Sequence, residues 1–338
     1  MNSDLARFSK EIAALDMKPL WERVMRLKPG TAAVPAIWRW RETRPLLMRA
    51  CELITAKQAE RRVLMLENPA LPGTTFITPS LYAGLQAILP GEIAPTHRHT
   101  PNALRFVMEG EGAYTAIDGE RIAMCPGDFV VTPGWTWHDH GNLGAKPVVW
   151  LDGLDTAFAN LFGAHFREDY PEETQGLSRP EGDSAARYGA NLLPLDRRPQ
   201  GPSSPVLSYP YERTRAALEQ LSKDGEPHLS HGWKLRYSNP ASGGHAFPTT
   251  AVFMQWLPKG FAGRRYQSTD GAVFCVVEGR GGVDIGETRF DFAPNDVFVV
   301  PSWGPYRFNA ATECVIFSYS DRAAQEALGF WREASGLA

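Results

Sequence analysis

Two stretches of this chain repeat one another, and this repeat limits the folds that the chain can adopt. The matching segments are LPGEIAPTHRHT with LPKGFAGRRYQST, FVMEGEGA with CVVEGRGG, and PGDFVVTPGW with PNDVFVVPSW. They align Leu89 with Leu257, Glu109 with Glu278, and Pro133 with Pro301, at offsets of 168 or 169 positions. A repeat of this length indicates two copies of one domain, each with its own barrel.

Each copy is predicted to be an antiparallel β-barrel. Short β-like runs are separated by turn signals about every ten residues, such as Asp118-Gly119 and Pro126-Gly127-Asp128. This spacing favours a barrel or jelly roll over a parallel α/β sheet. We therefore expect a mainly β fold with two tandem barrels and peripheral helices.

The chain is long enough, at 338 residues, for two domains with substantial cores. We predict a helical N-terminal arm over 1–60, a first barrel domain over 61–167, a linker rich in Pro, Gly and Ser over 168–210, and a second barrel domain over 211–338. Apolar spacing predicts helices at 4–28, 42–59 with Pro45 in the first turn, 211–222 and 323–331.

Composition excludes some classes of partner. The formal charge of −3 provides no basic field for nucleic acid. No run approaches the roughly 20 apolar residues that span a bilayer, and the N-terminus lacks an uninterrupted apolar core. The four cysteines are scattered without paired spacing, which indicates reduced thiols. We expect a cytoplasmic protein with no membrane or nucleic-acid partner.

Three histidines of the first copy have the spacing of metal ligands. His97 and His99 are separated by one residue, so both imidazoles leave the same face of an extended strand. His138 follows about forty residues later, after turns that would fold the intervening strands back antiparallel. A single histidine in a strand is more often structural, but this pattern predicts three imidazoles that converge on one metal ion.

Imidazoles suit divalent Zn, Fe, Ni, Co or Cu, and residue types alone do not separate these metals. Three protein ligands on one face of an octahedral ion leave three positions open. Without a carboxylate ligand the ion keeps its full 2+ charge, which would attract an anionic substrate.

The remaining histidines fall into two groups. His140 has the strand parity of His138, so we expect it to face the cavity as an acid-base or substrate-orienting group, with a structural hydrogen bond as the alternative. The others, His165, His228, His231 and His245, are expected to be structural or surface residues.

In the second copy, His97 aligns with Arg265, His99 with Gln267 and His138 with Tyr306. The second copy is therefore expected to bind no metal and to serve as a scaffold.

The histidine-rich stretch resembles the cupin family. GEIAPTHRH is similar to the first cupin motif, and GDFVVTPGWTWHDHGN is similar to the second. The usual glutamate after the histidine pair is missing, because Ala103 and Leu104 occupy its place. The gentisate 1,2-dioxygenase group of bicupins shares this departure. The chain also resembles that group in segments such as SLYAGLQAILPGEIAPTHRHTPNALRFVMEGEGAYTAIDGE and TPGWTWHDHGN. The resemblance runs from about residue 20 to 335.

The resemblance implies an Fe(II) enzyme that opens an aromatic ring with O2. Gentisate would chelate iron through its carboxylate and 2-hydroxyl, and cleavage between C1 and C2 would give maleylpyruvate. It also implies a homo-oligomer, a tetramer in this group. The alternatives are a salicylate or 1-hydroxy-2-naphthoate 1,2-dioxygenase, and a non-catalytic bicupin that binds metal and ligand. Tyr82, where broader-specificity relatives have Trp, favours gentisate.

The resemblance further implies substrate-binding and catalytic residues. Arg105 matches an arginine that contacts substrate, and a charge in a strand that otherwise looks buried needs an anion. Arg61 matches a second such arginine, with a surface role as the alternative. Tyr82, Gly84 and Gln86 would line the pocket, with Gly84 leaving room for a ring. Asp152 matches a carboxylate near the iron, where it could orient His140, so His140 and Asp152 are the catalytic candidates.

Overall fold

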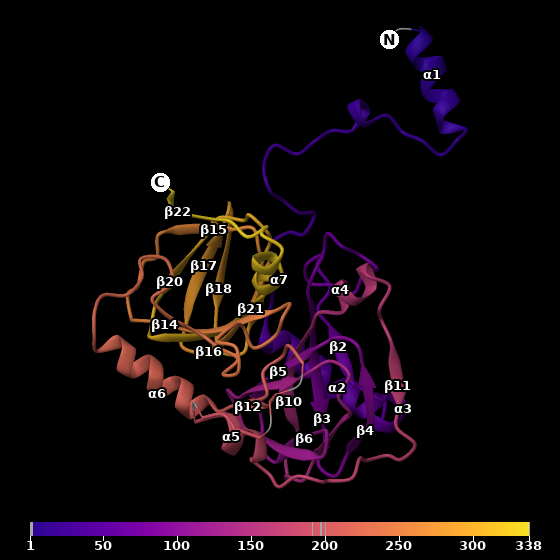
Figure 1. Ribbon diagram of the computed structural model, residues 1–338. Helices are drawn as coiled ribbons and strands as arrows, with labels where there is room; N and C mark the ends of the chain where they lie inside the picture. Colours follow the sequence, from indigo (N-terminus) through magenta and orange to yellow (C-terminus); the bar gives the residue numbers. More distant parts are fainter. Residues whose placement is uncertain (1–2, 191, 197, 200, 338) are drawn as a thin grey trace.

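The computed structural model describes residues 3–190, 192–196, 198–199 and 201–337. The fold is mainly β, and its sheets form two barrels, as the sequence predicts (Figure 1). Among the described residues, no helix has the length and apolar character needed to cross a lipid bilayer. Cys51, Cys125, Cys275 and Cys314 are all free thiols.

The first barrel is built from eleven strands in two sheets. They are β2 Val63–Met65, β3 Tyr82–Ile88, β4 Ile93–His99, β5 Ala103–Glu109, β6 Ala113–Ile117, β7 Glu120–Met124, β8 Phe129–Thr132, β9 His138–Asn142, β10 Val148–Leu154, β11 Arg167–Asp169 and β12 Ser208–Tyr209. One sheet has the order β12, β8, β5, β10, β3, β2, and the other β11, β4, β9, β6, β7. Side chains from both sheets, such as Val107 and Ile117, share one apolar cluster between them.

The second barrel repeats this arrangement. Its strands are β1 Ala36–Trp38, β13 Trp233–Arg236, β14 Ala251–Leu257, β15 Arg265–Ser268, β16 Ala272–Glu278, β17 Gly281–Ile285, β18 Thr288–Phe292, β19 Val297–Val300, β20 Tyr306–Ala310, β21 Cys314–Ser320 and β22 Glu333–Leu337. One sheet has the order β1, β19, β16, β21, β14, β13, and the other β18, β17, β20, β15, β22.

The two barrels exchange edge strands. β1 precedes the first barrel in the chain but pairs with β19 of the second. β12 precedes the second barrel but pairs with β8 of the first. The stretch between the barrels also contacts the first barrel, because β11 pairs with β4 and the buried Gln175 side chain bonds to Gly119 and Asp139. Each barrel is therefore completed by chain that lies outside its own repeat.

The helices are α1 Ser3–Ala13, α2 Trp40–Leu53, α3 Ala56–Ala59, α4 Thr156–Leu161, α5 Asp183–Tyr188, α6 Tyr211–Ser222 and α7 Arg322–Ala327, with the 3₁₀ turn η1 Leu20–Glu22. The predicted helix at 211–222 is confirmed by α6. The other three predicted helices differ from the observed ones in their bounds, because the local backbone begins or ends each helix at another residue.

Helix α1 ends well before the predicted residue 28, because Asp16 has a φ of 56° and Pro19 lacks an N–H to continue the helix. Pro45 lies inside α2 rather than in its first turn, since this helix already begins at Trp40. Helix α7 stops before Trp331, because Gly329 takes a φ of 73° just beyond it.

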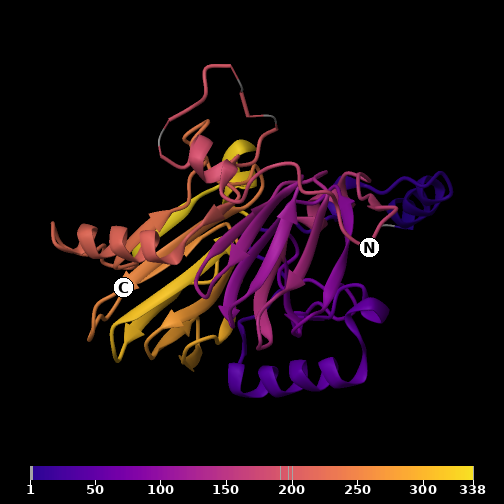
Figure 2. The same ribbon diagram turned by 90° about the horizontal axis from the view of Figure 1, so that it is seen from below.

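The six-stranded sheets of the two barrels pack against each other (Figure 2). Phe106 of β5 stacks on Phe317 of β21, with ring centroids 4.1 Å apart and planes 11° from parallel. Phe129 of β8 lies 6.0 Å from Phe317. One hydrophobic core thus joins both barrels, and it fixes the orientation of the sheets that line their interiors.

Replacing Phe317 by Ala is predicted to lower the free energy of unfolding by about 3–5 kcal/mol, because the deletion leaves a cavity between the barrels. Urea titration followed by tryptophan fluorescence measures this change. Phe162→Ala, which removes a ring that is 73% exposed, is the matched control and should change the value by less than about 0.5 kcal/mol. Equal losses in the two variants would contradict the shared core.

Candidate metal centre

The structure brings together the three histidines that the sequence singled out. β4 pairs with β9 in a register that sets His97 opposite His138, and strand alternation puts His99 on the same face as His97. One nitrogen from each ring lies within 4.8 Å of the others. Ring centroids are 4.5 Å apart for His97 and His138, and 4.8 Å for His99 and His138.

Backbone carbonyls fix the tautomer of two of these rings. Nδ1 of His99 donates to the carbonyl oxygen of Pro101 at 2.8 Å, and Nδ1 of His138 donates to that of Thr136 at 3.0 Å. A ring that donates from Nδ1 keeps its lone pair on Nε2, the nitrogen that remains available to a metal. Nε2 of His138 is buried and has no hydrogen-bond partner among the described residues.

Burial keeps all three rings neutral. Burial, together with the charge of Arg105, lowers the pKa of His99 to about 4. Burial also lowers the pKa values of His97 and His138 far below the usual range. Within the described part of the chain, no carboxylate belongs to the cluster. Three neutral nitrogen donors, one of them buried without a partner, fit a divalent metal ion.

The opposite sheet presents a row of residues to the histidines. In the register of β5, β10 and β3, Arg105 lies opposite Asp152, and Asp152 lies opposite Gly84. Tyr82 and Gln86 share the face of Gly84 because alternate residues of a strand point the same way. The predicted pocket residues thus occupy one face of the six-stranded sheet, across the barrel from β4 and β9.

Arg105 and Asp152 form a buried charged pair. Their side chains are 4% and 7% exposed, with Nε of Arg105 3.6 Å from Oδ1 of Asp152. Burial raises the pKa of Asp152 to about 6, whereas Arg105 and the hydrogen bond from Trp150 lower it. Burial also lowers the pKa of Arg105, and the charge of Asp152 opposes this. Because a buried charge is costly, the guanidinium would favour an anionic ligand.

Arg61 lies beside the same cluster rather than on a remote surface. It donates to the carbonyl oxygen of Pro95 at 2.8 Å. Burial lowers its pKa to about 9, and Arg105 and Arg167 lower it further, while Asp152 raises it. Its charge in turn helps to lower the pKa of His97.

Gly84 provides space that Tyr82 uses. A Cβ atom at Gly84 would lie 2.8 Å from the Tyr82 hydroxyl oxygen and 2.5 Å from Cγ1 of Val63. Glycine is therefore required for the Tyr82 phenol to fold over the strand. Burial raises the pKa of Tyr82, so the phenol stays protonated. Gln86 is 3% exposed and pairs through its backbone with Val63 and Trp150.

His140 lies next to the metal ligands, but Asp152 does not orient it. Its ring centroid is 5.9 Å from that of His138 and 5.4 Å from that of Trp150. Neither ring nitrogen has a hydrogen-bond partner among the described residues, whereas Asp152 accepts from Nε1 of Trp150 at 3.0 Å. The expected contact between His140 and Asp152 is thus wrong, because the Trp150 indole lies beside both groups. Burial lowers the pKa of His140, which leaves it neutral.

Comparison with known proteins agrees with this geometry. Residues 84–153 match the family model described as Cupin domain. Gentisate 1,2 dioxygenase 1 of Aquipseudomonas alcaligenes is 53% identical over 96% of this chain and 95% of its own length. The chain belongs to the gentisate 1,2-dioxygenase family. A crystal structure of salicylate 1,2-dioxygenase from Pseudaminobacter salicylatoxidans has a TM-score of 0.92 at 34% identity, covering 99% of both chains. A structure of the same enzyme described as adducts with gentisate also gives 0.92 and 34%, covering 99% of this chain and 94% of that one.

The sequence analysis did not identify two residues that contact the charged pair of the site. Thr132 accepts a hydrogen bond from Arg105, and Trp150 donates to Asp152. Strand parity offered a signal, because Trp150 shares a face with Asp152. The partner of Arg105 needed the register of β5 with β8, which no local pattern reveals.

Among its described residues the second barrel has no equivalent histidine cluster. The predicted alignment of the two barrels was wrong by one residue. Tyr266 lies opposite Tyr306 as His97 lies opposite His138. The backbone bond from Trp303 to Ser268 likewise matches that from Trp135 to His99. Tyr266 and Ser268, rather than Arg265 and Gln267, therefore replace His97 and His99. One extra residue before β15 causes the shift, which turns Arg265 outward.

The metal-free protein is predicted to lose stability as pH falls from 7 to 5. The four buried histidines have folded pKa values below the unfolded value of about 6.5, so the unfolded chain takes up more protons below that pH. The free energy of unfolding should fall by up to about 1.4 kcal/mol per pH unit for each histidine. Asp152 and Asp321, whose pKa values are both raised to about 6, oppose this loss below about pH 6.

Urea titrations of chelator-treated protein at several pH values measure this slope. His140→Gln should make the slope shallower, and His165→Gln, which replaces an exposed histidine, is the matched control. A slope that His140→Gln leaves unchanged would contradict the neutral state of this ring.

Proposed function

We propose that this chain is an Fe(II)-dependent gentisate 1,2-dioxygenase that cleaves the ring between C1 and C2 with O2 to give maleylpyruvate. The observation that carries the proposal is the cluster of three neutral imidazoles facing a buried guanidinium across the barrel. Family membership supports the reaction, and the relatives named above carry the names of such dioxygenases.

His97, His99 and His138 would hold the iron. Iron bound there would bring the acid and dioxygen into contact and pass electron density from the ring to oxygen. Iron rather than another divalent metal is inferred from the family, because three imidazoles suit several metals.

Arg105 is proposed to bind the substrate carboxylate. Its guanidinium is anchored by Thr132 and by Asp152, which leaves its orientation fixed before substrate arrives. Such preorganisation reduces the cost of positioning the acid. Arg61 would add positive potential from the edge of the site, while Tyr82, Gly84 and Gln86 would define the wall along which the ring lies.

His140 is proposed to take up a proton near the reacting groups. It is neutral, buried beside His138, and free of hydrogen-bond partners among the described residues. Its neutral imidazole can accept a hydrogen bond from the substrate hydroxyl, and the anionic charge of a bound substrate would raise the lowered pKa of the ring so that it can take up the proton. Asp152 would act through Arg105 rather than through His140.

Salicylate is the strongest competing substrate. It shares the carboxylate and the adjacent hydroxyl, so the same residues would bind it, and a salicylate dioxygenase shares this fold. Tyr82 supports gentisate, because its protonated phenol folds over Gly84 and can hydrogen-bond a further hydroxyl group.

Iron(II)-loaded protein is predicted to consume O2 with gentisate faster than with salicylate or 1-hydroxy-2-naphthoate. Arg105→Met should lower kcat/KM for gentisate by about 10–100-fold, because a charged hydrogen bond of roughly 1.5–3 kcal/mol is lost. Oxygen uptake and ring-cleavage absorbance measure both. Arg121→Met, on β7 beside Tyr114, is the matched control. Faster turnover of salicylate would overturn the substrate assignment, and binding without O2 uptake would favour a non-catalytic bicupin.

Substituting His138 by Ala is predicted to lower metal content by at least about tenfold, because only two ligands remain. Elemental analysis of protein purified without air measures the loss. Tyr306→Phe changes the matching position of the second barrel and should leave metal content near that of the wild type. Metal retained in the His138 variant would place the ion elsewhere.

The chain is further proposed to act as a cytoplasmic homo-oligomer, a tetramer as the family resemblance implies. The segment after α1 carries exposed apolar side chains, including Trp21 at 67%, Val24 at 92% and Leu27 at 99% exposed. An apolar segment of this kind is typical of a subunit contact. The free cysteines support a reducing compartment. Light scattering of the native protein tests the assembly.

A further inference from the structure

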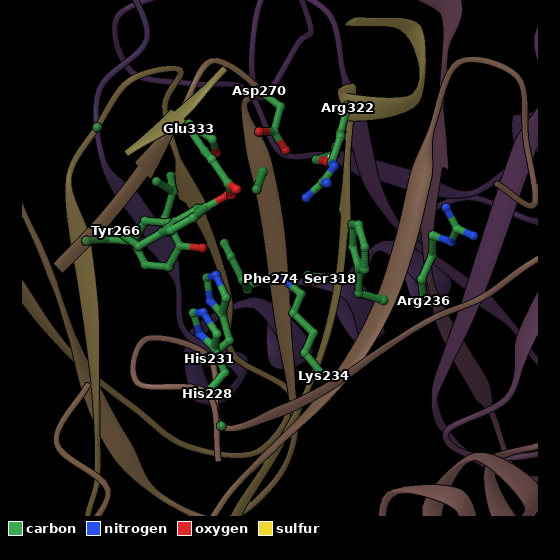
Figure 3. A pocket seen from close by; sticks show the side chains of 18 of the residues that line it. His228, His231, Lys234, Arg236, Tyr266, Asp270, Phe274, Ser318, Arg322 and Glu333 are labelled. Atoms are coloured by element: carbon green, nitrogen blue, oxygen red, sulfur yellow. Dashed lines mark hydrogen bonds between the residues drawn. The ribbon is translucent and has the colours of Figure 1, made fainter. Parts of the chain in front are cut away.

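The second barrel encloses a cavity of about 330 Å³ where the first holds its histidines. Tyr266, Ser268 and Tyr306, which replace the three histidines, line this cavity. Figure 3 shows side chains from several strands directed into it. A volume of this size lies at the lower end of the range for small-molecule sites.

The three residues that replace the histidines are poor ligands for a metal. His228, His231, Asp270 and Glu333 also line the cavity, but among the described residues of this barrel no three His, Cys, Asp or Glu side chains lie close enough together to hold one ion. Burial raises the pKa of Tyr266 and Tyr306, so both phenols stay protonated. The hydroxyl of Tyr266 donates to Oε2 of Glu333 at 2.7 Å. Protonated phenols with a serine hydroxyl do not provide the donor set that a divalent metal prefers.

A lysine supplies positive charge to this cavity. Lys234 of β13 extends into the middle of the space (Figure 3), and its Nζ lies 4.5 Å from the centre of the Phe253 ring. Among the described residues it forms no ion pair. Lys234 lies opposite Gln255 as Val63 lies opposite Gln86 in the first barrel. The cation therefore stands at a position where the metal-binding barrel has an apolar side chain.

The position of Arg105 is meanwhile taken by an aromatic ring. Phe274 lies opposite Ser318 in the second barrel, as Arg105 lies opposite Asp152 in the first. Ser318 is 2% exposed, and its hydroxyl has no hydrogen-bond partner within the described residues. The charged pair of the first barrel is thus replaced by a ring and an unpaired hydroxyl, while the cation comes from another strand.

The remaining charges around the cavity limit the ligand. Arg322 points in from the side opposite Lys234 (Figure 3), but it pairs with Glu326 and stacks on Trp331. Asp270 accepts from Nε1 of Trp331, and Glu333 accepts from Tyr266. Two carboxylates at the rim would repel a polyanion such as phosphate. A ligand with one carboxylate on an aromatic ring matches Lys234, which has no ion pair among the described residues, and the apolar wall formed by Phe253 and Phe274.

We propose that the second barrel is a metal-free binding site for a small hydroxylated aromatic carboxylate. The carboxylate would pair with Lys234, the ring would pack against Phe253 and Phe274, and Ser318 would hydrogen-bond the hydroxyl group. Burial lowers the pKa of Lys234 to about 8, Arg322 lowers it further and Asp270 raises it. An anionic partner would offset the cost of this buried ammonium. The site is additional to the metal centre and does not require its activity.

Equilibrium dialysis of chelator-treated full-length protein with labelled salicylate tests the site without any turnover. Arg105→Met impairs the first barrel, so the binding that it retains reports the second. In that background Lys234→Met is expected to weaken binding at least about tenfold, the loss of one charged hydrogen bond. Arg307→Met is the matched control in the same barrel, because Arg307 of β20 does not line the cavity, has a side chain that is 48% exposed, and donates to Asp284.

Ser318→Ala provides a second variant that leaves the charges in place, and it should weaken salicylate binding about three- to tenfold relative to a benzoate control that lacks the hydroxyl. Unchanged binding in both Lys234→Met and Ser318→Ala would overturn the proposal, as would equal losses in Arg307→Met. Binding of inorganic phosphate as tight as that of salicylate would also overturn it. Because the protein is free of metal throughout, failure here leaves the dioxygenase assignment untouched.

Discussion

The register of β4 against β9 is the constraint on which the metal centre depends. It sets His97 opposite His138, so two imidazoles from different strands start out as direct neighbours. The pairing is interrupted between Ala94 and His97, and a bulge of this kind re-aims the following side chains. A slip of one residue would turn both His97 and His99 out of the barrel. The turns at Gly110, Gly119 and Gly127, all at positive φ, help hold the strands between these histidines in that register.

The two sheets of the first barrel carry different kinds of polar group that face each other across its interior. One sheet provides neutral nitrogen donors, and the other provides Arg105 held by Asp152 and Thr132. Since no carboxylate joins the described histidines, a bound divalent ion would keep its full charge. An acid that enters this space meets the ion on one wall and a guanidinium on the other. The closed barrel strengthens both attractions, because electrostatic interactions grow as water is excluded.

The sequence predicted what depends on local pattern and missed what depends on pairing across sheets. Alternation placed His97 and His99 on one face of a strand, because side-chain direction in a strand has a period of two. Arg105 and Asp152 were expected near the site from the family resemblance. The helix at 211–222 was readable from its apolar spacing. The exchange of β1 and β12 between barrels was not readable, since it depends on residues far apart in the chain. The contact of Trp150 with Asp152 and the one-residue insertion before Tyr266 left local signals in strand parity and in the repeat offsets, but their consequences needed the strand register. Pro45 was misplaced because the preceding turn of α2 has no distinctive cap.

The two barrel interiors lie back to back across one packed interface. Along β5, Arg105 points into the first barrel and the next residue, Phe106, points into the core between the barrels. Along β21, Ser318 faces the cavity of the second barrel and the preceding Phe317 stacks on Phe106. On both strands, a residue that faces a barrel interior is thus followed or preceded directly by one that faces the shared core. Because close-packed rings transmit displacement rather than absorb it, neither sheet can shift at its interior face without moving the other. The second barrel thus presents a packed surface to the sheet that carries Arg105 and Asp152.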